Sequence, residues 1–305
     1  MNFSCNFKTY YPWIQAVRPL SYSYFVFSLT LGMAMYFESF KELHPINLCL
    51  TFFLGVFLQW YIVLANDFAD YDSDLANKFP TRFSGGSRVL PEQKIKPDKI
   101  RAFSTYSAAL ALMTAVIISI LVKSWGPTLL TATGITLLLV YSFEPFRLSY
   151  RGGGEVLQMI GLAIVLPIIG FQSQGGLQIP WGELLVLSPS QLGCAIATDF
   201  GDEPSDRLTE KKTIVVMFGK DHGRTMVIFL HSLSLFGLYK KEILNLDSIG
   251  FSILGLVVST LVIFNQYRLI KPDNEKMPIK IFFGILPTPI LVTCKIIHSL
   301  IIAGY

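Results

Sequence analysis

Charged residues are scarce in this chain. Asp, Glu, Lys and Arg make up 15% of its 305 residues, whereas 52% are hydrophobic. An ordinary soluble domain carries about 25% charged residues. This deficit is too large for a soluble core, and it indicates an integral membrane protein that folds in lipid.

Cysteine and histidine are also few, which disfavours disulfides, zinc sites and histidine-ligated metals. The four cysteines form no CxxC pair, and the four histidines are equally dispersed. These residues are Cys5, Cys49, Cys194, Cys294, His44, His222, His231 and His298. The first twenty residues lack the apolar core of a signal peptide, and we interpret them as a cytoplasmic lead-in to the first span.

Long apolar runs are abundant. A spanning helix needs about 20 mostly apolar residues, and nine segments are candidates. They are Pro19–Phe37, Ile46–Ala65, Ala102–Val122, Thr128–Phe143, Glu155–Phe171, Trp181–Thr198, Thr225–Leu238, Ile249–Tyr267 and Ile279–Ile302. No compositional break divides them. We therefore predict an all-α polytopic membrane protein, with nine transmembrane helices in a single domain (residues 1–305) around a central cavity.

The basic residues orient this bundle. Twenty of the 25 Lys and Arg residues fall before the first span or in the loops after even-numbered spans. Cytoplasmic loops of membrane proteins carry such an excess. We therefore expect the N-terminus on the cytoplasmic side and, with an odd number of spans, the C-terminus on the opposite side.

Two acidic clusters follow the second and sixth spans with the same spacing. Asp67, Asp70 and Asp74 in the first match three aspartates in the second, displaced by 132 positions. These are Asp199, Asp202 and Asp206. Thr81 and Thr213 then fall seven residues after each cluster's last aspartate. The match indicates an internal repeat, with halves at about 1–150 and 151–305.

This spacing suits a metal site. Residues four apart lie on one helix face, so Asn66, Asp70 and Asp74 form one row of oxygen ligands, and Asp202 and Asp206 form another. Carboxylates gathered on one face repel each other unless a cation neutralises them. Mg²⁺ prefers oxygen ligands and commonly binds carboxylates together with substrate phosphates. The two rows predict Mg²⁺ ions that bridge a diphosphate.

Basic residues beside the acids are candidates for binding that diphosphate. Arg82 and Arg88 flank a Gly-rich turn, whose backbone N–H groups can approach phosphate oxygens. Lys211 and Lys212 follow the second cluster. The alternative is that these residues only contribute to the positive charge of the cytoplasmic loops.

The paired motifs resemble those of the UbiA superfamily of intramembrane prenyltransferases, over almost the whole chain. The resemblance rests on NDxxDxxxD at 66–74, DxxxD at 202–206, Arg18-Pro19, and the loop with Tyr141–Pro145 and Gly152–Glu155. Residues 202–219 and 85–90 look most like the dihydroxynaphthoate polyprenyltransferases of menaquinone synthesis. That branch often has Lys-Gly where this chain has Asp72-Ser73, and Asn where it has Thr198-Asp199.

The resemblance implies transfer of a polyprenyl group from its diphosphate to an aromatic acid, with Mg²⁺ as cofactor. The implied catalytic residues are Asp67 (a candidate proton acceptor), Asp70, Asp74, Asp202 and Asp206. The candidate substrate-binding residues are Asn66, Arg82, Arg88, Tyr141, Arg147, Asp199, Lys211 and Lys212. Tyr141, Phe68 and Phe200 are candidates for stabilising an allylic cation, since aromatic faces attract cations.

Three alternatives stay open from sequence. In the first, the enzyme class is the same but the acceptor is a different molecule, or the prenyl chain cyclises on itself. In the second, the protein is a transporter of divalent cations, although the binding sites of transporters usually lie near the bilayer midplane. In the third, it is a catalytically inert subunit, which the complete set of acids disfavours. We expect no nucleic-acid partner and no obligate protein partner.

Overall fold

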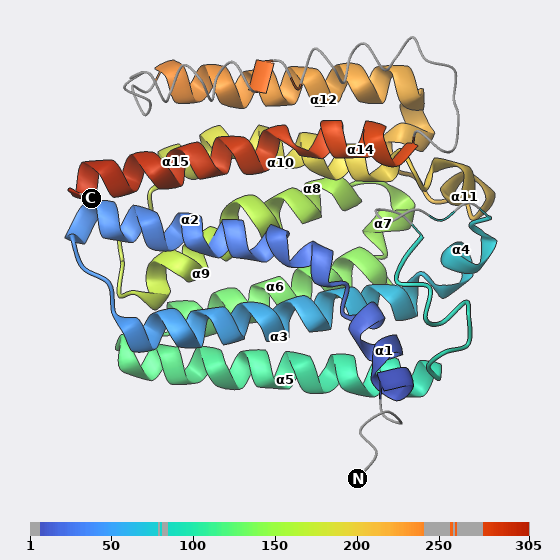
Figure 1. The fold of residues 1–305 in the computed structure, drawn as a ribbon, viewed down its shortest axis with the longest axis horizontal. Helices are drawn as coiled ribbons and strands as arrows, with labels where there is room; N and C mark the ends of the chain where they lie inside the picture. Colours follow the sequence, from blue (N-terminus) through green and yellow to red (C-terminus); the bar gives the residue numbers. More distant parts are fainter. Residues whose placement is uncertain are drawn as a thin grey trace.

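The computed structural model describes residues 7–78, 80, 85–240, 257–258, 260 and 277–304, and these residues form helices without strands. Figure 1 shows the long helices running side by side, with α12 along one side of the bundle and α5 along the opposite side. The short helices α4, α7 and α11 gather at one end of the bundle, and the C-terminus lies at the other end. The expected all-α membrane bundle is confirmed.

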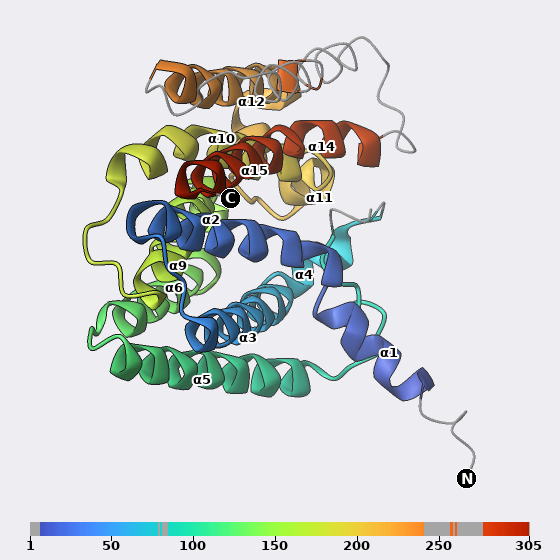
Figure 2. The same cartoon turned by 60° about the vertical axis from the view of Figure 1, so that its left-hand side comes forward.

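Most of the long helices begin and end within five residues of the predicted spans, whereas the helix that covers the seventh span starts at Ile214, eleven residues before it. In chain order they are α1 (Phe7–Ala16), the 3₁₀ turn η2 (Pro19–Ser21), α2 (Tyr22–Phe40), α3 (Pro45–Ala69), α4 (Tyr71–Ala76), α5 (Pro97–Leu121), α6 (Gly126–Ser142), α7 (Leu148–Arg151), α8 (Gly154–Ile160), the π-helical turn η3 (Gly161–Val165), α9 (Leu166–Ser173), α10 (Trp181–Asp199), α11 (Glu203–Leu208), α12 (Ile214–Lys240), α14 (Met277–Ile285) and α15 (Pro287–Ala303). In Figure 2, α1 extends away from the rest of the bundle.

The number of nine spans stays a prediction. Within the described residues, five helical stretches are long and apolar enough to cross a membrane. They are Tyr10–Phe40, Pro45–Ala69, Pro97–Leu121, Gly154–Ser173 and Ile281–Ala303, and the shorter Gly126–Ser142 is also apolar. Helices α10 and α12 cover the sixth and seventh predicted spans. The eighth, Ile249–Tyr267, lies almost entirely outside the described residues.

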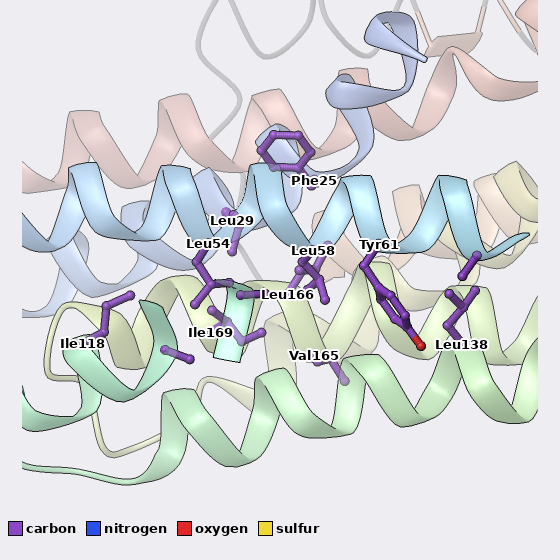
Figure 3. Packing of buried hydrophobic residues seen from close by; sticks show 13 residues of the cluster. Phe25, Leu29, Leu54, Leu58, Tyr61, Ile118, Leu138, Val165, Leu166 and Ile169 are labelled. Atoms are coloured by element: carbon purple, nitrogen blue, oxygen red, sulfur yellow. The ribbon is translucent and has the colours of Figure 1, made fainter. Parts of the chain in front are cut away.

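One tightly packed cluster of apolar side chains joins α2, α3, α5, α6 and the η3–α9 segment. Figure 3 shows Phe25 and Leu29 above Leu54 and Leu58, with Ile169 against them from the fifth predicted span. These five side chains are at most 2% exposed. The cluster fixes the helices that surround the cavity described below.

Two glycines let α2 and α9 approach closely. A Cβ atom on Gly32 would lie 1.8 Å from the carbonyl oxygen of Pro167, and one on Gly170 would lie 2.2 Å from that of Leu29. Lipid is as apolar as a leucine side chain, so membrane helices associate through close packing of small residues rather than through hydrophobic burial. The sequence places a glycine on each helix where the backbones meet.

Polar side chains make a second kind of helix contact. His231 accepts from Ser190 Oγ through Nδ1 at 2.8 Å and donates to the Gly284 carbonyl through Nε2 at 2.9 Å. The backbone N–H of Ser190, just after Pro189, donates to Ser234 Oγ at 2.8 Å. Neighbouring helices thus satisfy the backbone group that the proline disturbs, as a membrane interior requires.

A lysine inside the last apolar helix is likewise compensated. Lys295 is 1% exposed, and its Nζ lies 2.8 Å from Glu38 on α2 and 2.9 Å from Glu183 on α10. Ser299 donates to the same Glu38 oxygen at 2.7 Å. The ion pairs join three helices and explain how a charged residue is tolerated in an apolar segment.

Replacing Gly32 by alanine should destabilise the bundle, because the new methyl group collides with backbone atoms of α9. Overpacking of this kind costs about 2 kcal/mol, equivalent to roughly 5 °C in the unfolding midpoint. Gly161→Ala is the matched control, since nothing lies within 4 Å of its Cβ position. Thermal unfolding in detergent measures both. Equal midpoints for the two variants would contradict this packing.

Candidate active site

The two acidic clusters meet at one end of the bundle, where α3 is followed by the short helix α4 and α10 by the short helix α11 (Figure 1). Asn77, which follows α4, donates its side-chain N–H to Asp202 Oδ1 at 3.0 Å. Thr209, which follows α11, donates to Ser73 Oγ at 3.4 Å. Acids separated by 132 positions therefore share one site.

Both clusters have the same local structure. Helix α3 ends at Ala69 and the six-residue α4 starts at Tyr71, while α10 ends at Asp199 and the six-residue α11 starts at Glu203. Asp74 N–H donates to the Asp70 carbonyl at 2.8 Å, and Asp206 N–H does the same to Asp202. The last acid of each cluster thus lies in the first turn of a new helix, where the helix dipole favours negative charge.

Lys211 lies between the clusters. Its Nζ is 3.2 Å from Asp70 Oδ2 and 3.9 Å from Asp206 Oδ1, and its backbone N–H donates to the Asp206 carbonyl at 2.8 Å. It also lies 5.5 Å from the centre of the Tyr150 ring. Burial opposes its charge, but the carboxylates, led by Asp70, raise the pKa of Lys211 well above its ordinary value.

The acids lose part of their charge as they are arranged here. Burial raises the pKa of Asp202 to about 8, and the nearby Asp206 adds to this shift. Burial likewise raises the pKa of Asp74 and of Asp206 to about 6. One lysine and the nearby Arg18 therefore do not compensate the set, and a further cation among these carboxyls would be stabilised.

The ligand chemistry fits a hard divalent cation such as Mg²⁺. The donors are carboxylate and amide oxygens, and the buried Oδ1 of Asp70 and Oδ2 of Asp199 have no hydrogen-bond partner. In the part of the chain that the structure describes, no three acidic, histidine or cysteine side chains are grouped closely enough to hold an ion as they stand. Asn66, Asp70, Asp74, Asp202 and Asp206 stay the predicted ligands.

The segment after α4 folds back against the acids at two glycines. Gly85 and Gly86 have φ of 80° and 68°, values that side chains disfavour, and a Cβ on Gly86 would lie 1.9 Å from Asp74 Oδ2. The next residue, Ser87, donates its backbone N–H to Asp67 at 3.2 Å. The Gly-rich turn thus contacts carboxylates directly, while Arg82 lies outside the described residues.

Asp67 is committed to contacts within the protein. It is 2% exposed, pairs with Arg18, and accepts a second hydrogen bond from the Ser87 hydroxyl. It does not line the cavity that opens beside the two clusters. This arrangement indicates that Asp67 holds Arg18 and the Gly-rich turn in place, and its role as proton acceptor stays a prediction.

A cavity of about 300 Å³ opens from the acids into the bundle. Its polar end is lined by Arg18, Asn66, Asp199, Asp202, Asp206 and Lys211. Its walls are mainly apolar side chains, namely Leu58, Ile62, Val63, Leu137, Leu138, Leu157, Leu162, Val165 and Leu166. The π-helical turn η3 supplies part of the wall, and such turns frequently occur at functional sites.

Several predicted residues do not line the cavity. The Arg88 guanidinium donates to the Asp74 carbonyl, Arg147 stacks 3.6 Å from the centre of the Tyr150 ring, and Lys212 is exposed. Phe68 and Phe200 pack in separate apolar clusters, which leaves only Tyr141 of the three aromatic candidates at the cavity. Their proximity in sequence to the acids did not place them in the site.

Other lining residues have no motif that singles them out. Tyr24, Gln59 and Gln158 contribute polar groups to the cavity from three different helices. Arg18 also lines the cavity, although in the sequence it stood out only as part of a motif that resembles a family's. For the other three residues, the signal in the sequence was a single polar residue on an otherwise apolar span.

The sequence profile of the UbiA prenyltransferase family matches residues 25–286. Among curated proteins, none matches the chain in sequence. Among solved structures, a UbiA homolog from Archaeoglobus fulgidus bound to GPP and Mg²⁺ superposes with a TM-score of 0.70, over 96% of this chain and 100% of that one, at 16% identity. The same homolog bound to DMAPP and Mg²⁺ gives a TM-score of 0.69, over 96% and 99% of the two chains, also at 16% identity.

A digeranylgeranylglyceryl phosphate synthase gives a TM-score of 0.62 at 19% identity, over 96% of this chain and 99% of that one. A UbiA homolog from Aeropyrum pernix K1 gives 0.69 at 15% identity, over 90% and 98% of the two chains. Identities this low establish a shared fold and no more.

Replacing Asp67 by alanine should destabilise the protein, because it leaves the Arg18 charge without its partner. Removing one member of a buried pair costs about 3 kcal/mol. Glu144→Ala, which breaks the exposed pair with Arg151 (2.8 Å), should cost less than about 1 kcal/mol. Denaturant or thermal unfolding in detergent compares the two. A smaller loss for Asp67→Ala than for Glu144→Ala would refute the structural role of Asp67.

Proposed function

The chain belongs to the UbiA prenyltransferase family, and we propose that it transfers a polyprenyl group from an isoprenoid diphosphate to an aromatic acceptor, with Mg²⁺ as cofactor. The observation that carries this proposal is that Asn66, Lys211 and the acids of the second cluster line one end of an apolar cavity, where Lys211 also pairs with Asp70 of the first cluster. Asp70 and Asp74 are not themselves among the lining residues. A diphosphate needs cations and a prenyl chain needs apolar walls, and the cavity offers both. We place this end at the cytoplasmic face, where the basic loops lie.

The chain's own residues divide the task of holding the donor. Asn66, Asp70, Asp74, Asp202 and Asp206 would hold the metal, which when bound would neutralise charge on the diphosphate as a Lewis acid. Lys211, whose position is fixed by carboxylates, directs positive charge at the same group. These contacts stabilise the negative charge that the leaving group gains as its bond to the prenyl chain breaks.

The walls of the cavity protect the prenyl cation that this cleavage produces. Leucine, isoleucine and valine side chains exclude water, which would otherwise react with the cation. Tyr141 lines the same space, and its ring face attracts positive charge. An electron-rich acceptor ring then forms the new carbon–carbon bond, and the group that the attacked carbon carried leaves the ring. For a ring acid that is attacked at its carboxyl-bearing carbon this group is the carboxylate, which departs as carbon dioxide and leaves its bonding electrons to the ring.

The acceptor that we propose is a dihydroxynaphthoate-like acid of menaquinone synthesis. Residues 202–219 and 85–90 support this choice by their resemblance to that branch. An acid acceptor needs a cation for its carboxylate. Arg88 and Arg147, which sequence analysis gave as substrate-binding candidates, do not line the cavity, whereas Arg18 and Lys211 do. With Lys211 directed at the diphosphate, we assign the acceptor carboxylate to Arg18 at the polar end of the cavity.

Alanine at any one of Asp70, Asp74, Asp202 or Asp206 should lower prenyl transfer by about 100-fold or more, because each removes a ligand for the charge-stabilising metal. The measurement is Mg²⁺-dependent diphosphate release from labelled geranyl diphosphate by purified protein. Near-wild-type rates for any two of these variants would refute the metal assignment.

Two neighbouring acids serve as controls. Asp72 is exposed, and Glu203 pairs with Arg207 at 2.8 Å and with Lys220 at 3.0 Å instead of facing the cavity. Asp72→Ala and Glu203→Ala should therefore retain most of the activity. Their comparison with the four variants separates loss of a ligand from a general change in local charge.

Expression in a bacterium that lacks its own dihydroxynaphthoate prenyltransferase should restore menaquinone, because the proposed reaction supplies the missing step. Extraction and chromatography of quinones measures the outcome, and the Asp202→Ala variant is the negative control. If menaquinone does not return while the purified protein still releases diphosphate with another acceptor, the reaction class stands and the acceptor is wrong.

A further inference from the structure

Three polar side chains in the cavity are not used by the donor site described above. Tyr24 on α2, Gln59 on α3 and Gln158 on α8 all line it, together with Ser21. None of them is among the predicted metal ligands, and none carries a formal charge that would neutralise a diphosphate. They lie among apolar side chains of a membrane bundle, where an unpaired polar group is costly.

These side chains leave hydrogen-bonding groups free. Within the described part of the chain, neither the Tyr24 hydroxyl nor the Gln158 amide has a side-chain hydrogen bond, and Gln59 uses only its Nε2. A hydrocarbon chain against these groups would leave them unpaired. The occupant of this part of the cavity therefore carries oxygen or nitrogen atoms of its own.

A hydrogen-bond chain fixes which end of Gln59 faces the occupant. Ser21 Oγ donates to the Arg18 carbonyl at 2.7 Å, and Gln59 Nε2 donates to Ser21 Oγ at 2.7 Å. A hydroxyl has only one proton, so Ser21 must accept from Gln59 and the amide cannot be reversed. Gln59 Oε1 is thus left as an acceptor, and it calls for a donor such as a hydroxyl on the ligand.

We propose that Tyr24, Gln59 and Gln158 form the acceptor-binding part of the cavity, and that it selects an aromatic ring bearing a hydroxyl group, which donates to Gln59 Oε1. This inference rests on the proposed function. The chain from Gln59 through Ser21 to Arg18 places this subsite beside the basic residue assigned to an acceptor carboxylate. Ring hydroxyl and carboxylate are then recognised by different residues.

The test is equilibrium binding of two rings that share a carboxylate and differ in hydroxyls, 1,4-dihydroxy-2-naphthoate and 2-naphthoate, to purified protein by calorimetry. Wild type should bind the dihydroxy compound more tightly. Gln59→Leu and Gln158→Leu should weaken that binding by about 10-fold each and bring the two affinities together. Tyr24→Phe should have the same direction of effect.

The control is Gln191→Leu, which removes a buried glutamine on α10 that does not line the cavity and whose Oε1 has no partner. It should change neither affinity. Elution as a single species in size-exclusion chromatography checks that each variant is folded. Unchanged hydroxyl preference in both cavity variants, or no preference in wild type, would overturn the subsite.

Binding of geranyl diphosphate with Mg²⁺, measured on the same preparations, separates this inference from the proposed function. It should be unchanged in Gln59→Leu and Gln158→Leu, because the donor uses the acidic end. If wild type binds geranyl diphosphate but shows no hydroxyl preference, the subsite is wrong and the donor site stands. If geranyl diphosphate does not bind, the proposed function fails.

Discussion

The pairing of buried carboxylates with a few buried cations is the interaction on which the site depends. Lys211 joins Asp70 to Asp206, and so it couples the two halves of the chain at one end of the bundle. Arg18 and Asp67 form a second pair beside it. In a medium of low dielectric, unpaired charges of this kind would be expensive, so the arrangement stands only with its cations present. The same demand favours the metal ion that we propose for this end of the bundle.

The rest of the bundle positions this end without a strong hydrophobic drive. Helices in lipid associate by close packing and by direct polar contacts. Gly32 and Gly170 bring two backbones together, His231 links α10 to its neighbours, and Lys295 joins three helices with two glutamates. These contacts lie away from the acids. They keep the cavity walls in place.

The sequence anticipated the parts of the site that have local signatures and missed those that do not. The sequence predicted that both aspartate clusters lie at the same end of the bundle, because the second and sixth spans cross the membrane in the same direction. Arg88 and Arg147 were predicted at the site for their charge and position, but hydrogen bonding to backbone and stacking on a tyrosine direct them elsewhere. Gln59 and Gln158 were not predicted, because a single glutamine on an apolar helix has no recognisable pattern.

Composition, apolar run length and charge placement therefore determined the class of protein and the approximate helices, and they singled out the acids that we predict as metal ligands. These properties depend on residues near each other in the chain and on the solvent they require. Only the tertiary structure decided which side chains face the cavity, because that depends on how helices rotate and pack against one another. It is the packed bundle that assigns Asp67 to Arg18, places Lys211 between the clusters, and brings Gln59 to the cavity wall.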